Sequence, residues 1–172
     1  EISEPHPGRV QPRCPHFGTC GGCWLQHADI ATQHAYKCKS LEELFAAQNI
    51  NICAKVLASD DAYGYRRKAR LSVRFVAKKD KVLVGFREHA GRYVANIDQC
   101  PILVPEAEKL LTPLSELIYN LDCRESIPQI EVAAGENNLA LIVRHLQELS
   151  ASDLQAWKDF ATKHGVQLYL QP

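Results

Sequence analysis

The sequence predicts an α+β fold, in which a cysteine-rich loop and a helix precede antiparallel hairpins or a meander with packed helices. Three observations support this fold class. Alternating polar and apolar segments occur in pairs joined by short turns, single segments of helical periodicity lie between them, and three cysteines are concentrated near the N-terminus. Hairpins interleaved with single helices are typical of a sheet with helices on one face.

The first third of the chain is predicted to contain a linker, a cysteine-rich unit and a short strand. Residues 1–12 are rich in proline and poor in apolar side chains, so we interpret them as a linker from a missing upstream domain. Residues 13–48 form the cysteine-rich loop and a helix over 29–48, with Asp29 as the N-cap and an apolar stripe that includes Cys38. A short strand is expected over 52–58.

Residues 49–172 are predicted to form an α+β central domain. Proline at position 113 should kink or split its first helix, and a capping box of Ser152 with Gln155 predicts the start of its last helix near Ser150 or Ser152. The expected elements after residue 60 are a three-stranded meander over 66–76, 82–87 and 92–97, a helix over 105–121, a hairpin over 129–135 and 139–145, a helix ending at Gly165, and a strand over 166–172.

Charge is distributed unevenly along the chain, although the formal net charge is +0. Residues 1–100 carry 15 basic and 10 acidic side chains, whereas residues 101–172 carry 5 and 10. Nine basic residues and one acidic residue fall within 66–87. This asymmetry indicates a local surface for a polyanion rather than a uniformly basic protein.

The sequence contains no apolar run of about 18 residues and no signal-peptide core, so we expect a cytoplasmic protein that does not contact membranes. Seven cysteines in a reducing compartment indicate a metal site or thiol chemistry rather than disulfides. Methionine is absent even at position 1, and we therefore expect the chain to be a piece of a longer protein.

Cys14, Cys20 and Cys23 form a Cys-x5-Cys-x2-Cys motif that supplies three metal ligands from one loop. Cys100 is the best candidate for the fourth ligand because proline follows it, as in ferredoxin-type motifs. Zinc ribbons use two Cys-x2-Cys pairs, so this three-plus-one spacing favours a [4Fe-4S] cluster over structural zinc. A glycine turn between buried thiols is the alternative interpretation.

The glycines and the remaining cysteines are interpreted separately. Gly21 and Gly22 would let the backbone pass close to a bulky cluster. Cys38, Cys53 and Cys123 are interpreted as small buried hydrophobic residues.

A basic strand is the second candidate site. Period-2 alternation places Arg66, Lys68, Arg70 and Arg74 on one face of residues 66–76, at a spacing that can follow a nucleic-acid backbone. Neighbouring tyrosines could stack on exposed bases. A solvated strand face is the alternative. The candidate RNA-binding residues are Tyr63, Tyr65, Arg66, Arg67, Lys68, Arg70 and Arg74.

Four motifs carry a resemblance to a known family: CPHFGTCGGCWLQH, YGYRRKARLSVRF, VGFRE and DQCPIL. In their order and spacing, over about residues 13–172, they resemble the RNA (uracil-5-)-methyltransferase family, and most of all its iron–sulfur branch that acts on 23S rRNA. The resemblance implies that Cys14, Cys20, Cys23 and Cys100 hold the cluster. It implies 23S rRNA as the partner, and we infer no obligate protein partner.

The same resemblance implies that the chain corresponds to a central region. Family members have an N-terminal TRAM domain and a C-terminal domain that binds S-adenosylmethionine and supplies the cysteine that attacks uracil C6. No motif of that C-terminal domain occurs here, so no catalytic or cofactor-binding residue carries over, and the chain alone is expected to be inactive. Two other functions stay open from the residues: a zinc-containing RNA-binding module and a small iron–sulfur electron carrier.

Overall fold

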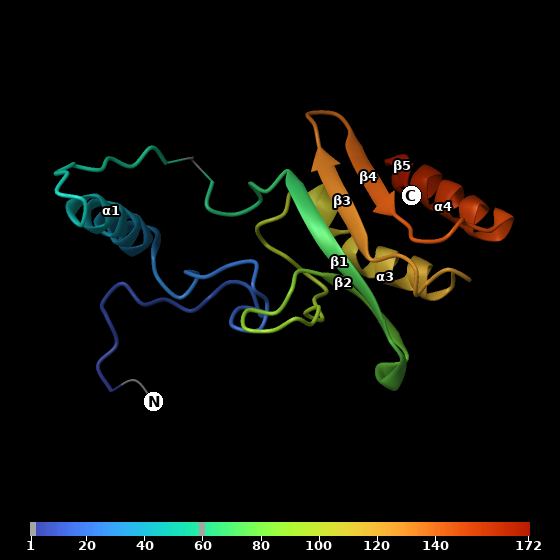
Figure 1. Cartoon of the computed structure of the whole chain (residues 1–172), viewed down its shortest axis with the longest axis horizontal. Coiled ribbons are helices and arrows are strands. Elements are labelled where there is room, and N and C mark those ends of the chain that lie inside the picture. The colour runs from blue at the N-terminus through green and yellow to red at the C-terminus, as the bar shows by residue number, and fades with distance from the viewer. Residues whose placement is uncertain (1–2, 59–60) are drawn as a thin grey trace.

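The computed structural model describes residues 3–58 and 61–172, so residues 1–2 of the predicted linker and residues 59–60 of the predicted central domain lie outside the described residues. The cysteine-rich loop and the first helix lie to one side of a sheet that carries the remaining helices (Figure 1). The elements, in chain order, are α1 (Ile30–Ala46), β1 (Lys68–Val76), the short 3-10 helix η1 (Ala77–Lys79), β2 (Lys81–Gly85), α2 (Pro105–Glu108), α3 (Leu111–Tyr119), β3 (Gln129–Ala134), β4 (Leu139–Arg144), α4 (Ala151–His164) and β5 (Gln167–Gln171).

The sheet has five strands in the order β2-β1-β3-β4-β5. All neighbouring pairs are antiparallel except β4 and β5, which are parallel and connected through α4. The predicted α+β class is confirmed, as are the strands expected around 66–76, 82–87, 129–135, 139–145 and 166–172.

The predicted three-stranded meander is wrong in its third strand. Within the described residues, 92–97 form no strand and make a single bridge, between Arg87 and Val94, while β1 pairs with β3 instead. Ile97 folds over Gly85, where a Cβ atom would lie 2.7 Å from the Ile97 Cγ1 atom. The segment therefore leaves the sheet at the end of β2 and carries the chain towards Cys100.

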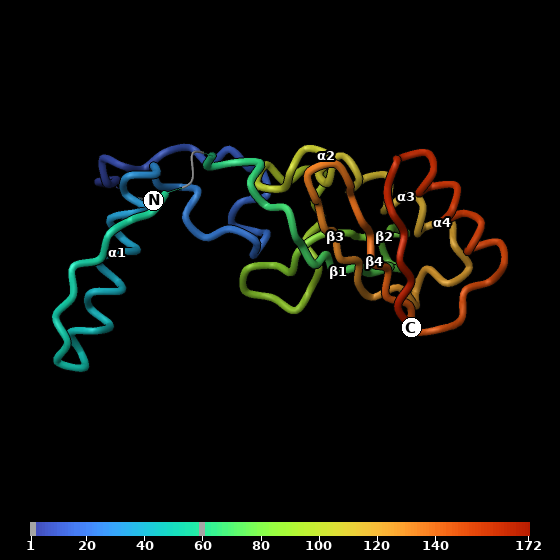
Figure 2. Tube along the Cα trace, turned by 90° about the horizontal axis from the view of Figure 1, so that it is seen from above, coloured from blue at the N-terminus to red at the C-terminus, as the bar shows by residue number. Residues whose placement is uncertain are grey.

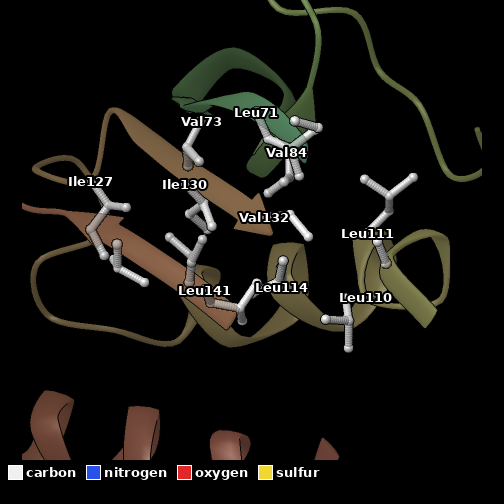
Figure 3. Close-up of a cluster of buried hydrophobic side chains, with 14 of the residues drawn as sticks. Leu71, Val73, Val84, Leu110, Leu111, Leu114, Ile127, Ile130, Val132 and Leu141 are labelled. Atoms are coloured by element: carbon white, nitrogen blue, oxygen red, sulfur yellow. The ribbon is translucent and has the colours of Figure 1, made fainter. Parts of the chain in front are cut away.

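The core lies between one face of the sheet and the helices behind it (Figure 3). Alternation along β1 buries Leu71 and Val73 and leaves Arg70 and Arg74 exposed, as period-2 spacing predicts. Helix α3 contributes Leu111, Leu114 and Ile118 at helical spacing, and Trp157 of α4 is fully buried. The opposite face of β1 is consequently free to present charge.

Helix boundaries follow local capping chemistry. The carboxylate of Asp29 accepts a hydrogen bond from the Thr32 N–H at 2.7 Å, which confirms the predicted N-cap of α1. The helix expected over 105–121 is split into α2 and α3, and Pro113 lies in the first turn of α3, where a missing N–H is tolerated. Ser150, rather than Ser152, caps α4, which ends at Gly165 with φ 63°.

Helix α1 projects away from the sheet (Figure 2). None of its seventeen residues, all of which the structure describes, is buried, so the apolar stripe predicted for this helix faces no core. The strand expected over 52–58 is also wrong, because these described residues have no regular structure. In residues 3–58 and 61–172, no helix combines the length and the apolar character that crossing a membrane requires.

Candidate metal centre and nucleic-acid surface

Four cysteines from two distant segments line one small cavity. Cys14, Cys20 and Cys23 come from the N-terminal loop, and Cys100 comes from the segment that follows the crossing of Gly85. The rest of the cavity wall is largely apolar and includes Phe86, Ile97 and Ile102. All seven cysteines, each within the described residues, are free thiols.

Tight turns shape the loop so that its three thiols face the same cavity. The Phe17 N–H donates to the Cys14 carbonyl, and the Cys20 N–H donates to the His16 carbonyl at 2.8 Å. The Gly22 N–H lies 3.4 Å from the Cys20 Sγ atom, within the reach of a weak hydrogen bond to sulfur. The side-chain Oε1 of Gln26 accepts a hydrogen bond from the Cys14 N–H at 3.1 Å.

The loop is joined to the segment after β2 by backbone hydrogen bonds. The Gly21 N–H donates to the Arg87 carbonyl at 2.8 Å, and the His89 N–H donates to the Thr19 carbonyl at 2.9 Å. A Cβ atom at Gly21 would lie 2.9 Å from the Arg87 carbonyl oxygen. Glycine is needed at this position because the two backbones approach so closely. The sequence-based reason for this glycine, space for a cluster, is not the contact that the structure shows.

The segment around Cys100 is fixed by three further contacts. The Cys100 backbone N–H donates to the Glu108 carboxylate at 2.7 Å. The Arg66 N–H donates to the Ile102 carbonyl at 2.8 Å, which ties the segment to the approach to β1. The His16 Nε2 atom lies 2.7 Å from the Asp98 carboxylate and connects the segment to the N-terminal loop.

Burial raises the pKa values of three thiols around the cavity, those of Cys14, Cys20 and Cys100. The pKa of Cys100 is raised to about 11, mainly because the thiol is removed from water and further because Cys23 and Cys14 are close. The pKa values of Cys14 and Cys20 are raised for the same first reason. The thiols of Cys14, Cys20 and Cys100 therefore keep their protons near neutral pH, and a metal would have to displace these protons.

The donor set fits an iron–sulfur cluster in its chemistry, since four thiols and no carboxylate line the cavity. The side-chain nitrogen of Gln26 adds a buried donor without a partner among the described residues. The cavity volume is about 10 Å³, close to the space for one water, so the thiols would have to move apart to admit a cluster. As they stand, no three His, Cys, Asp or Glu side chains in 3–58 and 61–172 form a metal-ion site.

The other three cysteines lie away from this cavity. Cys123 is buried, as expected, and burial together with the Asp153 carboxylate raises its pKa to about 12. The expectation of burial is wrong for Cys53, which is exposed, and for Cys38, which is only half-buried on α1. Both lie in the part of the chain that projects from the sheet, where there is no core to receive them.

Three of the predicted RNA-binding residues, Lys68, Arg70 and Arg74, lie exposed on one face of β1. Their charges are not equivalent. The guanidinium of Arg70 contacts the Glu131 carboxylate of β3 at 2.9 and 3.0 Å, opposite it in the strand register. Arg74 instead has Leu83 as its register partner on β2.

The other four predicted RNA-binding residues lie off this face. Arg66 precedes β1, and its half-buried guanidinium lies 4.8 Å from the centre of the Phe86 ring, beside the cysteine cavity. The Arg67 Nη1 atom donates to the Gly135 carbonyl at 2.7 Å, at the turn between β3 and β4. Tyr63 and Tyr65 line a hollow of about 250 Å³ with Trp24 and Lys37, which we call the aromatic hollow. It adjoins the cysteine cavity, since Cys23 and Gln26 line both.

Sequence reasoning missed several residues of these surfaces. Arg74 lines a hollow of about 690 Å³ together with Lys79, Arg87, Arg92 and Tyr93, which we call the basic hollow. Trp24, 64% exposed, packs against the His89 ring in a tilted arrangement, with 4.0 Å between ring centres and 46° between ring planes. The high density of basic residues through Arg87 was visible in the sequence, but the bend that brings Arg92 back to β1 was not.

No family model matches the chain. Among curated proteins it is 45% identical to the "23S rRNA (uracil(1939)-C(5))-methyltransferase RlmD" of Paracidovorax citrulli, over 99% of the chain and 36% of the relative. The chain is homologous to a region of the RlmD proteins. Proteins of the same name from Stenotrophomonas maltophilia and Verminephrobacter eiseniae are 47% and 49% identical, over 99% and 95% of the chain and 39% and 35% of their own lengths.

The match to the RlmD proteins is partial on their side, since the chain spans little more than a third of their length. Among solved structures, the fold resembles a Pyrococcus abyssi tRNA (uracil-54, C5)-methyltransferase in complex with S-adenosyl-L-homocysteine, with a TM-score of 0.63 and 20% identity. That likeness covers 91% of this chain and 37% of the other, and it concerns the fold alone. The RNA uracil-C5 methyltransferase resemblance that the motifs predicted is confirmed.

Proposed function

We propose that this chain is the iron–sulfur and RNA-binding region of a 23S rRNA uracil-C5 methyltransferase. The observation that carries the proposal is the convergence of Cys14, Cys20, Cys23 and Cys100 on one cavity, across a separation of 77 residues between the last two. Homology to the RlmD proteins along the whole chain supports the RNA and the reaction class.

A [4Fe-4S] cluster in the cavity would join the N-terminal loop to the segment of Cys100 by iron–sulfur bonds. Neighbouring contacts already hold the loop in place. The His16 ring contacts the Asp98 carboxylate near Cys100, and the Gly21 N–H donates to the Arg87 carbonyl after β2. The apolar wall restricts access of water to the thiols. We therefore assign the cluster a positioning function for the adjacent surface.

RNA contact is proposed for two neighbouring surfaces. The basic hollow supplies four cations, from Arg74, Lys79, Arg87 and Arg92, suited to consecutive phosphates. The aromatic hollow presents Trp24 and Tyr65, which are 64% and 55% exposed, and Lys37, suited to stacking on an unpaired base. The cysteine loop connects the two hollows. Trp24 of the aromatic hollow directly follows Cys23, and the Gly21 N–H donates a hydrogen bond to the carbonyl of Arg87, which lines the basic hollow.

For the intact protein we propose methyl transfer from S-adenosylmethionine to uracil C5, in the cytoplasm. The chemistry requires an unstacked uridine, which explains the value of a surface that holds single-stranded or looped RNA. Methyl transfer from a sulfonium to C5 places no net electron demand on a cluster. This chain supplies no nucleophile or S-adenosylmethionine site in the proposal, and we expect it to bind RNA without methylating it.

The cluster is tested by metal analysis of the 172-residue chain prepared without oxygen. We expect about four irons and four acid-labile sulfides per chain. Cys100→Ser should lose most of both, whereas Cys53→Ser, a matched change at an exposed thiol away from the cavity, should retain them. One zinc per chain without sulfide would overturn the cluster and support a zinc-containing module instead.

RNA binding is tested with an rRNA fragment across a range of salt concentrations. The triple variant Arg74→Ala/Arg87→Ala/Arg92→Ala should bind more weakly, and the slope of log affinity against log salt should fall by roughly 2 to 3 because three phosphate contacts are lost. The control, Lys55→Ala/Lys158→Ala/Lys163→Ala, removes equal charge elsewhere. Equal effects of the two variants would contradict a local RNA site.

A further inference from the structure

Gln26 is a buried amide on the wall of the cysteine cavity. Its side chain is 9% exposed, and it lines the same cavity as all four proposed ligands. The Nε2 atom has no hydrogen-bond partner among the described residues. A buried donor without a partner is costly, so its retention calls for an acceptor at this place.

The orientation of this amide is set by its other end. Oε1 accepts a hydrogen bond from the Cys14 N–H at 3.1 Å. Turning the amide over would place its NH₂ group against a backbone N–H, two donors facing each other, so the assignment of oxygen and nitrogen is fixed by chemistry. The oxygen thus supports the backbone of the first ligand, and the NH₂ group is left to find another acceptor on the wall of the cavity that the four cysteines line.

Other polar groups around the cavity are already engaged or solvated. The His16 ring contacts the Asp98 carboxylate, the Gly22 N–H faces the Cys20 sulfur, and the Gln99 side chain is exposed. Among the described residues that line the cavity, Gln26 thus contributes a donor that is both buried and uncommitted. The acceptors available to it on the occupied site are sulfur atoms.

We propose that Gln26 is a positioning residue whose NH₂ group donates a hydrogen bond to a sulfur atom of the cluster or of a ligating cysteine. The proposal rests on the iron–sulfur site proposed above. Sulfur carries more negative charge in the reduced cluster, so a nearby N–H donor stabilises the reduced form and raises the reduction potential. Gln26 would also hold Cys14 in place through its oxygen.

The test compares Gln26→Met with Gln99→Met in anaerobic protein. Both glutamines line the cavity, and methionine has a similar volume but no N–H donor, so Gln99 provides the matched control. The reduction potential is measured by electrochemical titration followed by electron paramagnetic resonance. A second readout uses glutamine labelled with ¹⁵N in its side chain, which gives a hyperfine coupling to the reduced cluster where the amide is close.

We expect Gln26→Met to change the ratio of reduced to oxidised cluster about tenfold, equivalent to a potential lower by about 59 mV for one electron. The ¹⁵N coupling should disappear in this variant and persist in Gln99→Met. A coupling that persists in Gln26→Met, or potentials equal to wild type, would overturn the role of Gln26 while leaving the cluster intact. If Gln26→Met does not retain iron, the same ¹⁵N measurement is made on Gln26→Glu, which has no side-chain nitrogen at this position. The coupling should then be absent, and a coupling that persists in Gln26→Glu overturns the proposal. Wild-type protein without iron would overturn the cluster itself, and the Gln26 proposal with it.

Discussion

The Nε2 atom of His16 lies 2.7 Å from the Oδ1 atom of Asp98, although 82 residues separate them in the sequence. This pair joins the loop that carries three cavity thiols to the segment that carries the fourth. The hydrogen bond from His16 lowers the pKa of the Asp98 carboxyl group. Asp98 is exposed, so the pair adds little to global stability, and its importance is local.

Replacement of Asp98 by alanine should weaken the connection between the two segments without disrupting the fold. We expect iron loss to a chelator to become about two- to fivefold faster, because an exposed ion pair contributes only a small free energy. The melting temperature should change little. The control is Asp159→Ala, whose carboxylate contacts Gln155 on α4, far along the chain from the cavity. Equal rates of iron loss in the two variants would contradict the role of the His16–Asp98 pair.

Replacement of Gly21 by alanine should be destabilising because its Cβ atom would lie 2.9 Å from the Arg87 carbonyl oxygen. We expect a loss of about 1–3 kcal/mol in the free energy of unfolding, typical of an overpacked site. Gly135→Ala is the control, since a Cβ atom there meets its nearest neighbour at 3.6 Å. Chemical denaturation followed by circular dichroism measures both, and the prediction fails if the two losses are equal.

Arg70 and Arg74 should contribute unequally to RNA binding. Arg70 is paired with Glu131, so Arg70→Ala removes a charge that is already partly compensated. Arg74 makes no such ion pair within the described residues, and it lies in the basic hollow, where three other cations outnumber the one carboxylate, Glu88. We expect the larger fall in salt slope, roughly 1, for Arg74→Ala. Glu131→Gln should tighten binding by freeing Arg70, and this gain should vanish in the Arg70→Ala background.

Cys123 and Cys53 should differ in reactivity. The side chain of Cys123 is buried and its pKa is raised to about 12, so its thiolate is scarce. The side chain of Cys53 is exposed. Iodoacetamide at pH 8 should therefore modify Cys53 quickly and Cys123 only after unfolding, as read by peptide mass spectrometry. Equal modification of both in guanidinium is the control.

The same shift predicts a dependence of stability on alkaline pH. Because the folded pKa of Cys123 is raised, its contribution is fully present below the ordinary thiol pKa of about 8.5 and is lost as pH rises towards 12. The free energy of unfolding should thus fall less steeply above pH 8.5 in Cys123→Ala than in wild type. Denaturation curves at several pH values measure this difference, and identical slopes would refute it.

Local patterns predicted the elements whose burial depends on nearby residues. Alternation identified β1, and a turn at 135–138 joined β3 to β4, because each pattern reports which face of a strand is buried. The pairing of β1 with β3 was missed, since the choice of partner depends on contacts distant in sequence. The crossing of Ile97 over Gly85, which displaces the expected third strand, is such a contact.

The candidate site was predictable to a similar degree. Cys14, Cys20, Cys23 and Cys100 were chosen from spacing, and the structure brings these four thiols to one cavity. Two features of the site could not be predicted from the sequence: the hydrogen bond between the Gln26 side chain and the Cys14 N–H, and the position of Arg66. Period-2 spacing placed Arg66 beside Lys68, but β1 begins at Lys68, and Arg66 turns towards Phe86.

Backbone hydrogen bonds from Gly21 to Arg87 and from His89 to Thr19 make the thiol loop and one wall of the basic hollow a single mechanical unit. On the proposed function this unit binds two ligands, a cluster and RNA, and the free energy that couples two binding events is reciprocal. Whatever factor the intact cluster adds to RNA affinity, bound RNA must add to cluster retention. Bound RNA would then slow the loss of the cluster, and iron starvation would lower the affinity for RNA before the sheet unfolds.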